Sequence, residues 1–372
     1  MKYTNFKDIK ISKLGFGVMR LPLIEGGGEA DIDYEKAEAL VDYAYEQGVN
    51  YYDTAYIYHG EQSEEFIGKA LSKYPRDSYY VADKFNLQAN PNYREQFELQ
   101  LKRLNLDRID FYMLHGVQDP NLATVSENGC IPYFDSLKAE GKIKYFGFSF
   151  HGSPDGFKQL LSMYDWDFVM IQLNYYDWAY GEAKELYKLA EEKNIPLMIM
   201  EPVRGGKLAT LTPEASQLLN EVEPSRSIAS WAMRWLMDLP QIAVVLSGMS
   251  TLEQVKDNVS TFTEFKALDD SEKKTLHEAC ELFRPTVAAA CTDCRYCIAD
   301  CPKELDIPRL LKVYNDIKID HMWRIVLLGN LPKSQQPENC TACGICVKQC
   351  PQDLDIPKYM TELVKWSNEK DK

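Results

Sequence analysis

Eight of the ten cysteines in this chain fall between residues 291 and 350, in two copies of one short motif. Each copy has the spacing C-x2-C-x2-C-x3-C-P. Three cysteines spaced three residues apart can bind the corners of one iron–sulfur cubane. The fourth, displaced further and followed by proline, points towards a different cluster. The pattern therefore predicts two [4Fe–4S] clusters.

The duplication of the motif predicts that each cluster takes its fourth ligand from the other copy. The predicted ligand sets are Cys291, Cys294, Cys297 and Cys350 for one cluster, and Cys340, Cys343, Cys346 and Cys301 for the other. Zinc is the alternative, but zinc usually takes two C-x2-C pairs separated by a longer loop. The stretch resembles a bacterial two-cluster ferredoxin, except that a long segment, 303–339, separates the motifs.

Length and charge limit the class of protein. The 372 residues are enough for two domains, and the formal net charge of −14 argues against nucleic acid or an anionic membrane as a partner. No apolar run approaches the roughly 18 residues of a membrane span, and the first residues lack an apolar signal-peptide core. We expect a cytoplasmic protein whose clustered thiols bind metal rather than form disulfides.

Residues 1–262 alternate short apolar segments with amphipathic helical ones. The expected strands begin at Gly15, Asn50, Tyr79, Ile109, Tyr145, Phe168, Pro196 and Ile242. Their nearly continuous apolar content is typical of strands buried on both faces. Eight such units in about 250 residues predict a TIM (β/α)8 barrel. A doubly wound sheet would usually show G-x-G-x-x-G after its first strand, and this chain has GFGVMRLP there instead.

The predicted division of the chain has three parts. They are a TIM barrel over 1–262, a connecting helix over 263–284, and a ferredoxin-like α+β domain with two [4Fe–4S] clusters over 285–372. Residues 3–13 are expected to form a small hairpin that plugs the floor of the barrel.

Four polar residues stand at or just after the ends of three consecutive predicted strands: Asp53, Tyr58, Lys84 and His115. Barrel enzymes place their catalytic groups at the C-terminal ends of the strands. A single buried lysine or histidine in such a strand has an ordinary structural explanation. Four ionisable groups on neighbouring strand ends instead predict one reactive site.

These residues, in YYDTAYIYHGEQSEEFIGKAL, VADKF and YMLHG, resemble the Asp–Tyr–Lys–His tetrad of the aldo-keto reductase family. The resemblance covers about residues 13–258, and with the cluster motifs it resembles a ferredoxin-fused branch. It implies reduction of a small carbonyl substrate by NAD(P)H, with Tyr58 as proton donor. Lys84 would lower the pKa of the phenol, Asp53 would orient Lys84, and His115 would place the substrate oxygen.

The same resemblance assigns the cofactor face. The implied nicotinamide and phosphate contacts are Ser149, Gln172, Asn174, Arg204, Gly205, Gly206, Gly248, Ser250, Gln254 and Asn258. Met200 or Glu201 stands where many relatives stack a tyrosine on the nicotinamide. Basic residues for a 2′-phosphate are absent at the matching positions, so NADPH and NADH both stay open. A flavin is a further alternative, because that end of a TIM barrel commonly binds phosphate.

The role of the clusters leaves three hypotheses, because a nicotinamide gives two electrons together and a cluster accepts one. In the first, the barrel is an NAD(P)H-dependent carbonyl reductase, and the clusters are structural, regulatory or electron-transferring. In the second, the site is coupled to a flavin or to the clusters, and the iron–sulfur domain exchanges electrons with it or with a redox partner protein. In the third, the chain is a non-catalytic electron carrier or redox sensor.

Overall fold

The fold is given by a computed structural model that describes residues 1–287, 289, 291, 294–319, 322–352 and 354–369, with only the backbone at 285–287 and 299. The chain forms two compact units, Met1–Pro202 with Ser230–Leu268, and Val203–Ala229 with Asp269–Lys372. The segment 203–229 therefore belongs with the cysteine-rich part of the chain. The boundaries expected at 262 and 284 stay predictions, and part of the range 285–372 lies outside the described residues.

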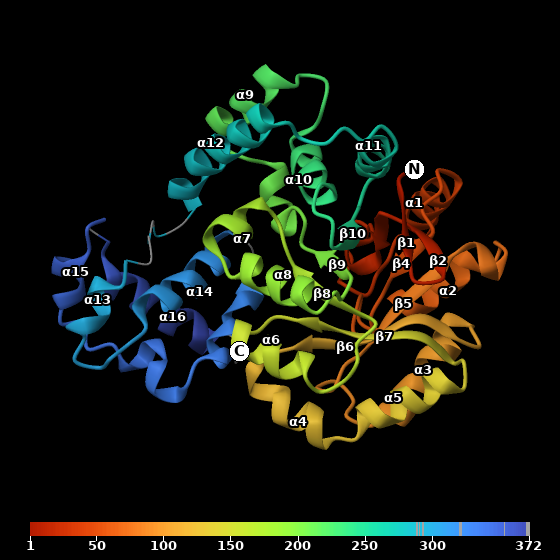
Figure 1. Cartoon of the computed structure of the whole chain (residues 1–372), viewed down its shortest axis with the longest axis horizontal. Coiled ribbons are helices and arrows are strands. Elements are labelled where there is room, and N and C mark those ends of the chain that lie inside the picture. The colour runs from red at the N-terminus through yellow and green to blue at the C-terminus, as the bar shows by residue number, and fades with distance from the viewer. Residues whose placement is uncertain (288, 290, 292–293, 320–321, 353, 370–372) are drawn as a thin grey trace. The chain divides into compact units, whose positions relative to one another are not determined.

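The first unit contains a closed barrel of eight parallel strands (Figure 1). The strands follow one another around the barrel in sequence order, and the last pairs with the first. They are β3 (Leu14–Gly17), β4 (Tyr51–Asp53), β5 (Tyr80–Phe85), β6 (Ile109–Val117), β7 (Ile143–Phe150), β8 (Phe168–Gln172), β9 (Leu197–Met200) and β10 (Ile242–Gly248). Each overlaps a segment predicted from its apolar content, so the TIM barrel is confirmed.

An antiparallel hairpin, β1 (Tyr3–Phe6) with β2 (Ile9–Ser12), precedes the barrel. Its Phe6 and Ile11 are buried in the same apolar core as side chains from the barrel strands. The Phe6 ring lies 5.2 Å from that of Phe111 and 4.9 Å from that of Tyr145. Both partners lie near the starts of their strands, so the hairpin closes the N-terminal end, as expected, and leaves the C-terminal end for chemistry.

Helices follow the barrel strands, and side-chain caps fix where several of them start. Asp33, Asn92, Ser153 and Thr251 each accept a backbone N–H three residues further on, which satisfies a donor that the first turn leaves free. These helices are α1 (Tyr34–Glu46), α2 (Ser63–Leu71), α3 (Tyr93–Leu104), α4 (Leu122–Glu127), α5 (Cys130–Ala139), α6 (Pro154–Leu161), α7 (Tyr175–Tyr180), α8 (Ala183–Glu192), α10 (Ile228–Met237) and α11 (Leu252–Thr263).

In the second unit, every regular element among the described residues is helical. The elements are η4 (Arg204–Ala209), α9 (Pro213–Val222), α12 (Asp270–Val287), α13 (Tyr296–Ala299), α14 (Ile307–Ile319), η5 (Met322–Asn330), η6 (Lys333–Gln335), η7 (Pro337–Asn339), α15 (Ile345–Gln349) and α16 (Ile356–Glu369). The strands of the expected α+β domain are not among them, because the described chain between and after the two motifs is helical. Within the described ranges, no helix has both the length and the apolar character that a bilayer span requires.

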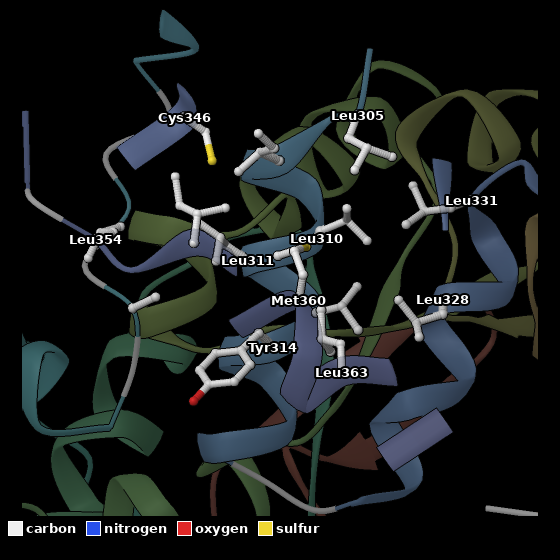
Figure 2. Packing of buried hydrophobic residues seen from close by; sticks show 14 of the residues in the cluster. Leu305, Leu310, Leu311, Tyr314, Leu328, Leu331, Cys346, Leu354, Met360 and Leu363 are labelled. Atoms are coloured by element: carbon white, nitrogen blue, oxygen red, sulfur yellow. The ribbon is translucent and has the colours of Figure 1, made fainter. Parts of the chain in front are cut away.

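The second unit has an apolar core of its own (Figure 2). Helix α14 contributes Leu310, Leu311 and Tyr314, and helix α16 contributes Met360 and Leu363. Two motif cysteines, Cys297 and Cys346, are buried in this core, one from each copy of the motif. Four others are partly buried and pack against the core: Cys291, Cys301, Cys340 and Cys350. The predicted ligands are therefore carried by a packed scaffold.

Candidate active site and cluster sites

Lys84 and Asp53 form a buried ion pair at the C-terminal end of the barrel. Strand β4 ends at Asp53, which pairs with Ala82 of β5, so Lys84 lies two residues beyond the last paired position. Its Nζ donates to Oδ1 of Asp53 at 2.6 Å and also to the carbonyl of Thr54. The two side chains are only 2% and 5% exposed, so the ammonium is held by these partners rather than by water.

Tyr58 and His115 complete the cluster. The Nζ of Lys84 lies 4.9 Å from the centre of the Tyr58 ring. The Tyr58 and His115 rings meet edge to face, with 5.8 Å between their centres and 84° between their planes. Contacts therefore link all four predicted tetrad residues in one place, although they come from three strands and a loop.

The electrostatics of the tetrad keep the phenol protonated and the lysine charged. Burial raises the pKa of Tyr58, and Asp53 adds to this effect, while the Lys84 ammonium lowers it; the net pKa lies above the usual value. Burial lowers the pKa of Lys84, but Asp53 and Tyr58 outweigh it, so this pKa is also raised. The predicted effect of Lys84 on the phenol is present, but burial exceeds it.

His115 is neutral at ordinary pH. Burial lowers its pKa well below the usual value, and the positive charge of Lys84 and the nearby His151 act in the same direction. The amide of Asn86 donates to Nδ1 of His115 at 3.4 Å. The proton of the neutral ring is then on Nε2, which can donate to a substrate oxygen.

The residues expected around the nicotinamide make contacts within the protein. The hydroxyl of Ser149 accepts the backbone N–H of Gly116 at 2.7 Å, which holds the end of β6 beside His115. The side-chain amides of Gln172 and Asn174 both donate to Oδ2 of Asp177, at 2.6 and 2.7 Å. Asp177 thus fixes the orientation of these two amides. The role of all three residues in binding the cofactor stays a prediction.

The residues expected around the adenosine phosphate lie between the end of β10 and helix α11. The backbone N–H of Ser250 is bound by Oε1 of Gln254 at 2.8 Å, and Asn258 donates to Ser247 at 3.0 Å. Gly248 leaves room for Arg20, because an added Cβ would lie 3.1 Å from that side chain. This segment has the form of a turn followed by a capped helix, which suits a phosphate.

Arg204, Gly205 and Gly206 lie in the second unit. The two glycines have φ values of +64° and +93°, a region that glycine adopts without strain. Arg204 is buried, and its guanidinium pairs with Asp316 of helix α14. Their expected contact with the pyrophosphate stays a prediction.

The eight motif cysteines divide between two cavities in the predicted sets. One cavity is lined by Cys291, Cys294, Cys297 and Cys350. The other is lined by Cys301, Cys340, Cys343 and Cys346. In the part of the chain that the structure describes, no three His, Cys, Asp or Glu side chains converge as for a single metal ion. Sulfurs arranged around a space fit a polynuclear cluster better than zinc.

Two features of the site were not predicted from the sequence, namely the effect of Glu201 on Tyr58 and the presence of buried carboxyl groups behind Lys84. Glu201 follows strand β9, and its negative charge acts on Tyr58. Asp83 and Glu64 are fully buried carboxyl groups behind Lys84. The signal for Asp83 was a charged residue inside an apolar strand next to Lys84; such a residue needs a buried partner.

Comparisons with known proteins agree with this geometry. Residues 13–281 match the aldo/keto reductase family, and residues 290–354 match the 4Fe-4S dicluster domain. The chain belongs to the aldo/keto reductase family and carries a C-terminal 4Fe–4S dicluster domain. It is an oxidoreductase of the aldo/keto reductase type, and the resemblance read from the tetrad is confirmed.

Individual relatives match about three quarters of this chain. The chain is 28% identical over 303 residues to L-galactose dehydrogenase of Arabidopsis thaliana, covering 74% of this chain and 92% of that protein. It is 26% identical over 324 residues to the NADH-specific methylglyoxal reductase of Escherichia coli, covering 74% and 96%. Its structure is similar to that of aldo-keto reductase AKR11C1 from Bacillus halodurans, with a TM-score of 0.63, 28% identity, and coverage of 75% and 96%.

Proposed function

We propose that this protein reduces an aldehyde or ketone with a hydride from NAD(P)H, and that Tyr58 gives the proton to the carbonyl oxygen. The observation that supports this most directly is the set of contacts that joins Asp53, Lys84, Tyr58 and His115 at the C-terminal end of the barrel. A bound nicotinamide would supply the hydride. The product alcohol gains the hydride at carbon and the phenolic proton at oxygen.

Each tetrad residue has a task that follows from its surroundings. The phenol of Tyr58 is protonated at neutral pH, since burial raises its pKa. As the proton leaves, the adjacent Lys84 ammonium stabilises the phenolate. Asp53 keeps Lys84 charged and in place through the 2.6 Å ion pair. The Nε2–H of neutral His115 orients the carbonyl oxygen towards the phenol.

For the cofactor, we propose NADH or NADPH with the adenosine phosphate at the start of helix α11. Thr251 caps that helix, and Ser250 and Gln254 shape the turn before it. The lack of basic residues at the positions that would hold a 2′-phosphate favours NADH, which the name of the E. coli relative also suggests. We also propose a cytoplasmic location, because clusters held by free thiols need a reducing compartment.

We propose that the two cavities hold the clusters by the cross-ligation predicted above, and that the hydride step itself takes place in the barrel alone. A flavin would instead be needed to pass single electrons between the clusters and a two-electron reaction. The visible spectrum of anaerobically purified protein, with extraction of its cofactors, separates these mechanisms. A flavin band would favour the cluster-coupled mechanism and a redox partner protein.

The test of the proposed function is Tyr58→Phe. Loss of the proton donor should lower kcat for a test aldehyde by a factor on the order of 10²–10⁴, with NAD(P)H binding retained. Tyr80→Phe, at the opposite end of strand β5, is the matched control and should keep its activity. Full turnover by Tyr58→Phe would overturn the assignment of the tetrad.

A further inference from the structure

The backbone N–H and carbonyl of Lys84 are both hydrogen-bonded by side chains, those of Asp83 and Gln100. Strand β4 pairs with β5 only as far as Ala82, so it does not reach Lys84. Asp83 accepts the backbone N–H of Lys84 on Oδ1 at 2.8 Å. The side-chain amide of Gln100 donates to the carbonyl of Lys84 at 3.0 Å. Consecutive strand residues face opposite sides, so Asp83 lies on the helix side of β5 while Lys84 faces the site.

Glu64, on helix α2, is the second carboxyl group of this network. Its Oε1 accepts from Gln100 and its Oε2 accepts from Arg103, both at 2.9 Å. The hydroxyl of Tyr112 donates to Oε1 of Gln100, which fixes the amide nitrogen towards Glu64 and Lys84. Both oxygens of Glu64 therefore receive donors, one of them a guanidinium, and its negative charge is compensated.

Asp83 and Glu64 are both fully buried, and their carboxyl groups are within hydrogen-bonding contact. The second oxygen of Asp83, Oδ2, is buried and accepts from no donor among the described residues. Two buried carboxylates in contact would repel each other in a medium of low polarity. One hydrogen between them removes both the repulsion and the unsatisfied oxygen.

We propose that Asp83 is a positioning residue for Lys84 and that it retains its proton at neutral pH, donating it to the Glu64 carboxylate. The positioning part rests on the proposed function, because it concerns the catalytic lysine. The charged and titratable groups around Asp83 are Glu64 from α2, Tyr112 from β6, Lys84 on its own strand, and Arg103 from α3 through Glu64. Burial and the Glu64 charge raise the pKa of Asp83 well above its usual value.

Two matched amide substitutions locate the proton. In Asp83→Asn, the amide nitrogen donates to Glu64 and the oxygen still accepts from Lys84, so kcat should stay within about twofold of wild type. In Glu64→Gln, an amide NH2 group faces Gln100 or Arg103, both of which are donors, and kcat should fall roughly tenfold. The kcat of Asp83→Leu, which can bind neither the Lys84 backbone N–H nor Glu64, should fall by a similar factor. If Glu64→Gln keeps its kcat while Asp83→Asn loses activity, the shared proton belongs to Glu64 and the proposal is wrong.

The pH dependence of stability tests the proton without using turnover. Asp83 keeps its proton in the folded chain and loses it in the unfolded chain, so the folded state binds more protons and stability falls as the pH rises. Urea unfolding followed by circular dichroism, from about pH 5 to pH 7, should show a shallower decline for Asp83→Asn than for wild type. Equal slopes would overturn the shared proton. If the pH slopes of Asp83→Asn and wild type differ but Tyr58→Phe keeps full turnover, the proton on Asp83 is supported. The positioning role is then lost, because Lys84 would not belong to a catalytic tetrad.

Discussion

At the scale of single residues, the site depends on charges that are buried and paired. Counted over the whole residue, Lys84 is 1% exposed and Asp53 is 4% exposed. A buried ion pair gains little net free energy over an apolar pair, but removing one partner leaves an uncompensated charge and is costly. The pair is therefore explained better by what it does to Tyr58 than by stability. The ion pair is therefore expected to affect the free energy of unfolding only when Lys84 or Asp53 is changed alone.

Lys84→Met is predicted to lower the free energy of unfolding by about 3–5 kcal/mol, because it leaves the Asp53 carboxylate buried without its partner. Asp53→Asn on the Lys84→Met background should recover part of that loss, since it removes the isolated charge. Urea unfolding of the two single variants and the double variant measures the coupling. A double variant whose loss equals the sum of the single losses would show that the two side chains do not interact.

At the scale of elements, the ends of neighbouring strands decide which residues meet. Strand β4 has three residues and ends at Asp53, while β5 and β6 run further and carry Lys84 and His115. Register between parallel neighbours then brings these side chains to one end of the barrel. In the second unit, short helices α13 and α15 carry the third cysteine of each motif. The equivalence of these two elements reflects the duplication in the sequence.

Cross-ligation makes a prediction about pairs of cysteines. Cys301→Ser with Cys340→Ser should damage one cluster only, because both residues line the same cavity. Cys301→Ser with Cys291→Ser should damage both clusters. Iron and acid-labile sulfide analysis, with electron paramagnetic resonance of the reduced protein, distinguishes the two variants. The opposite ranking of iron content would show that each motif binds its own cluster.

At the scale of the whole molecule, two units have separate apolar cores. The core of the barrel contains Phe6 and Phe111, and the core of the cysteine-rich unit contains Leu310 and Leu363. Two of the cluster ligands, Cys297 and Cys346, are buried within the second core. The structure of that unit should therefore depend on its metal more strongly than the structure of the barrel does.

Removal of iron from the full chain by an oxidant and a chelator is predicted to loosen the second unit while carbonyl reduction continues. Loss of helical signal by circular dichroism, with NAD(P)H oxidation by a test aldehyde retained, is the expected result. Reconstitution with iron and sulfide is the control and should restore the helical signal. Loss of turnover while the barrel stays folded would show that the clusters take part in the reaction.

Most of the fold and the meeting of four polar residues at one end of the barrel could be predicted because their signals are local. Strands such as Ile109–Val117 are nearly continuous apolar runs, and the cysteine spacing is a property of eleven consecutive residues. The engagement of Gln172 and Asn174 with Asp177 could not be predicted in the same way, because it depends on how a loop folds back. Neither could the pairing of Arg204 with Asp316, which are far apart in the sequence.

The amino-acid sequence was enough to predict the barrel and the two cluster motifs, since periodicity and spacing encode them directly, and it placed four ionisable residues at neighbouring strand ends, which the family resemblance then marked as a tetrad. The electrostatics of the site required the folded chain. The raised pKa of Tyr58 and the proton assigned to Asp83 both depend on burial and on partners from other elements. Burial is a property of the packed chain, so no stretch of sequence contains it.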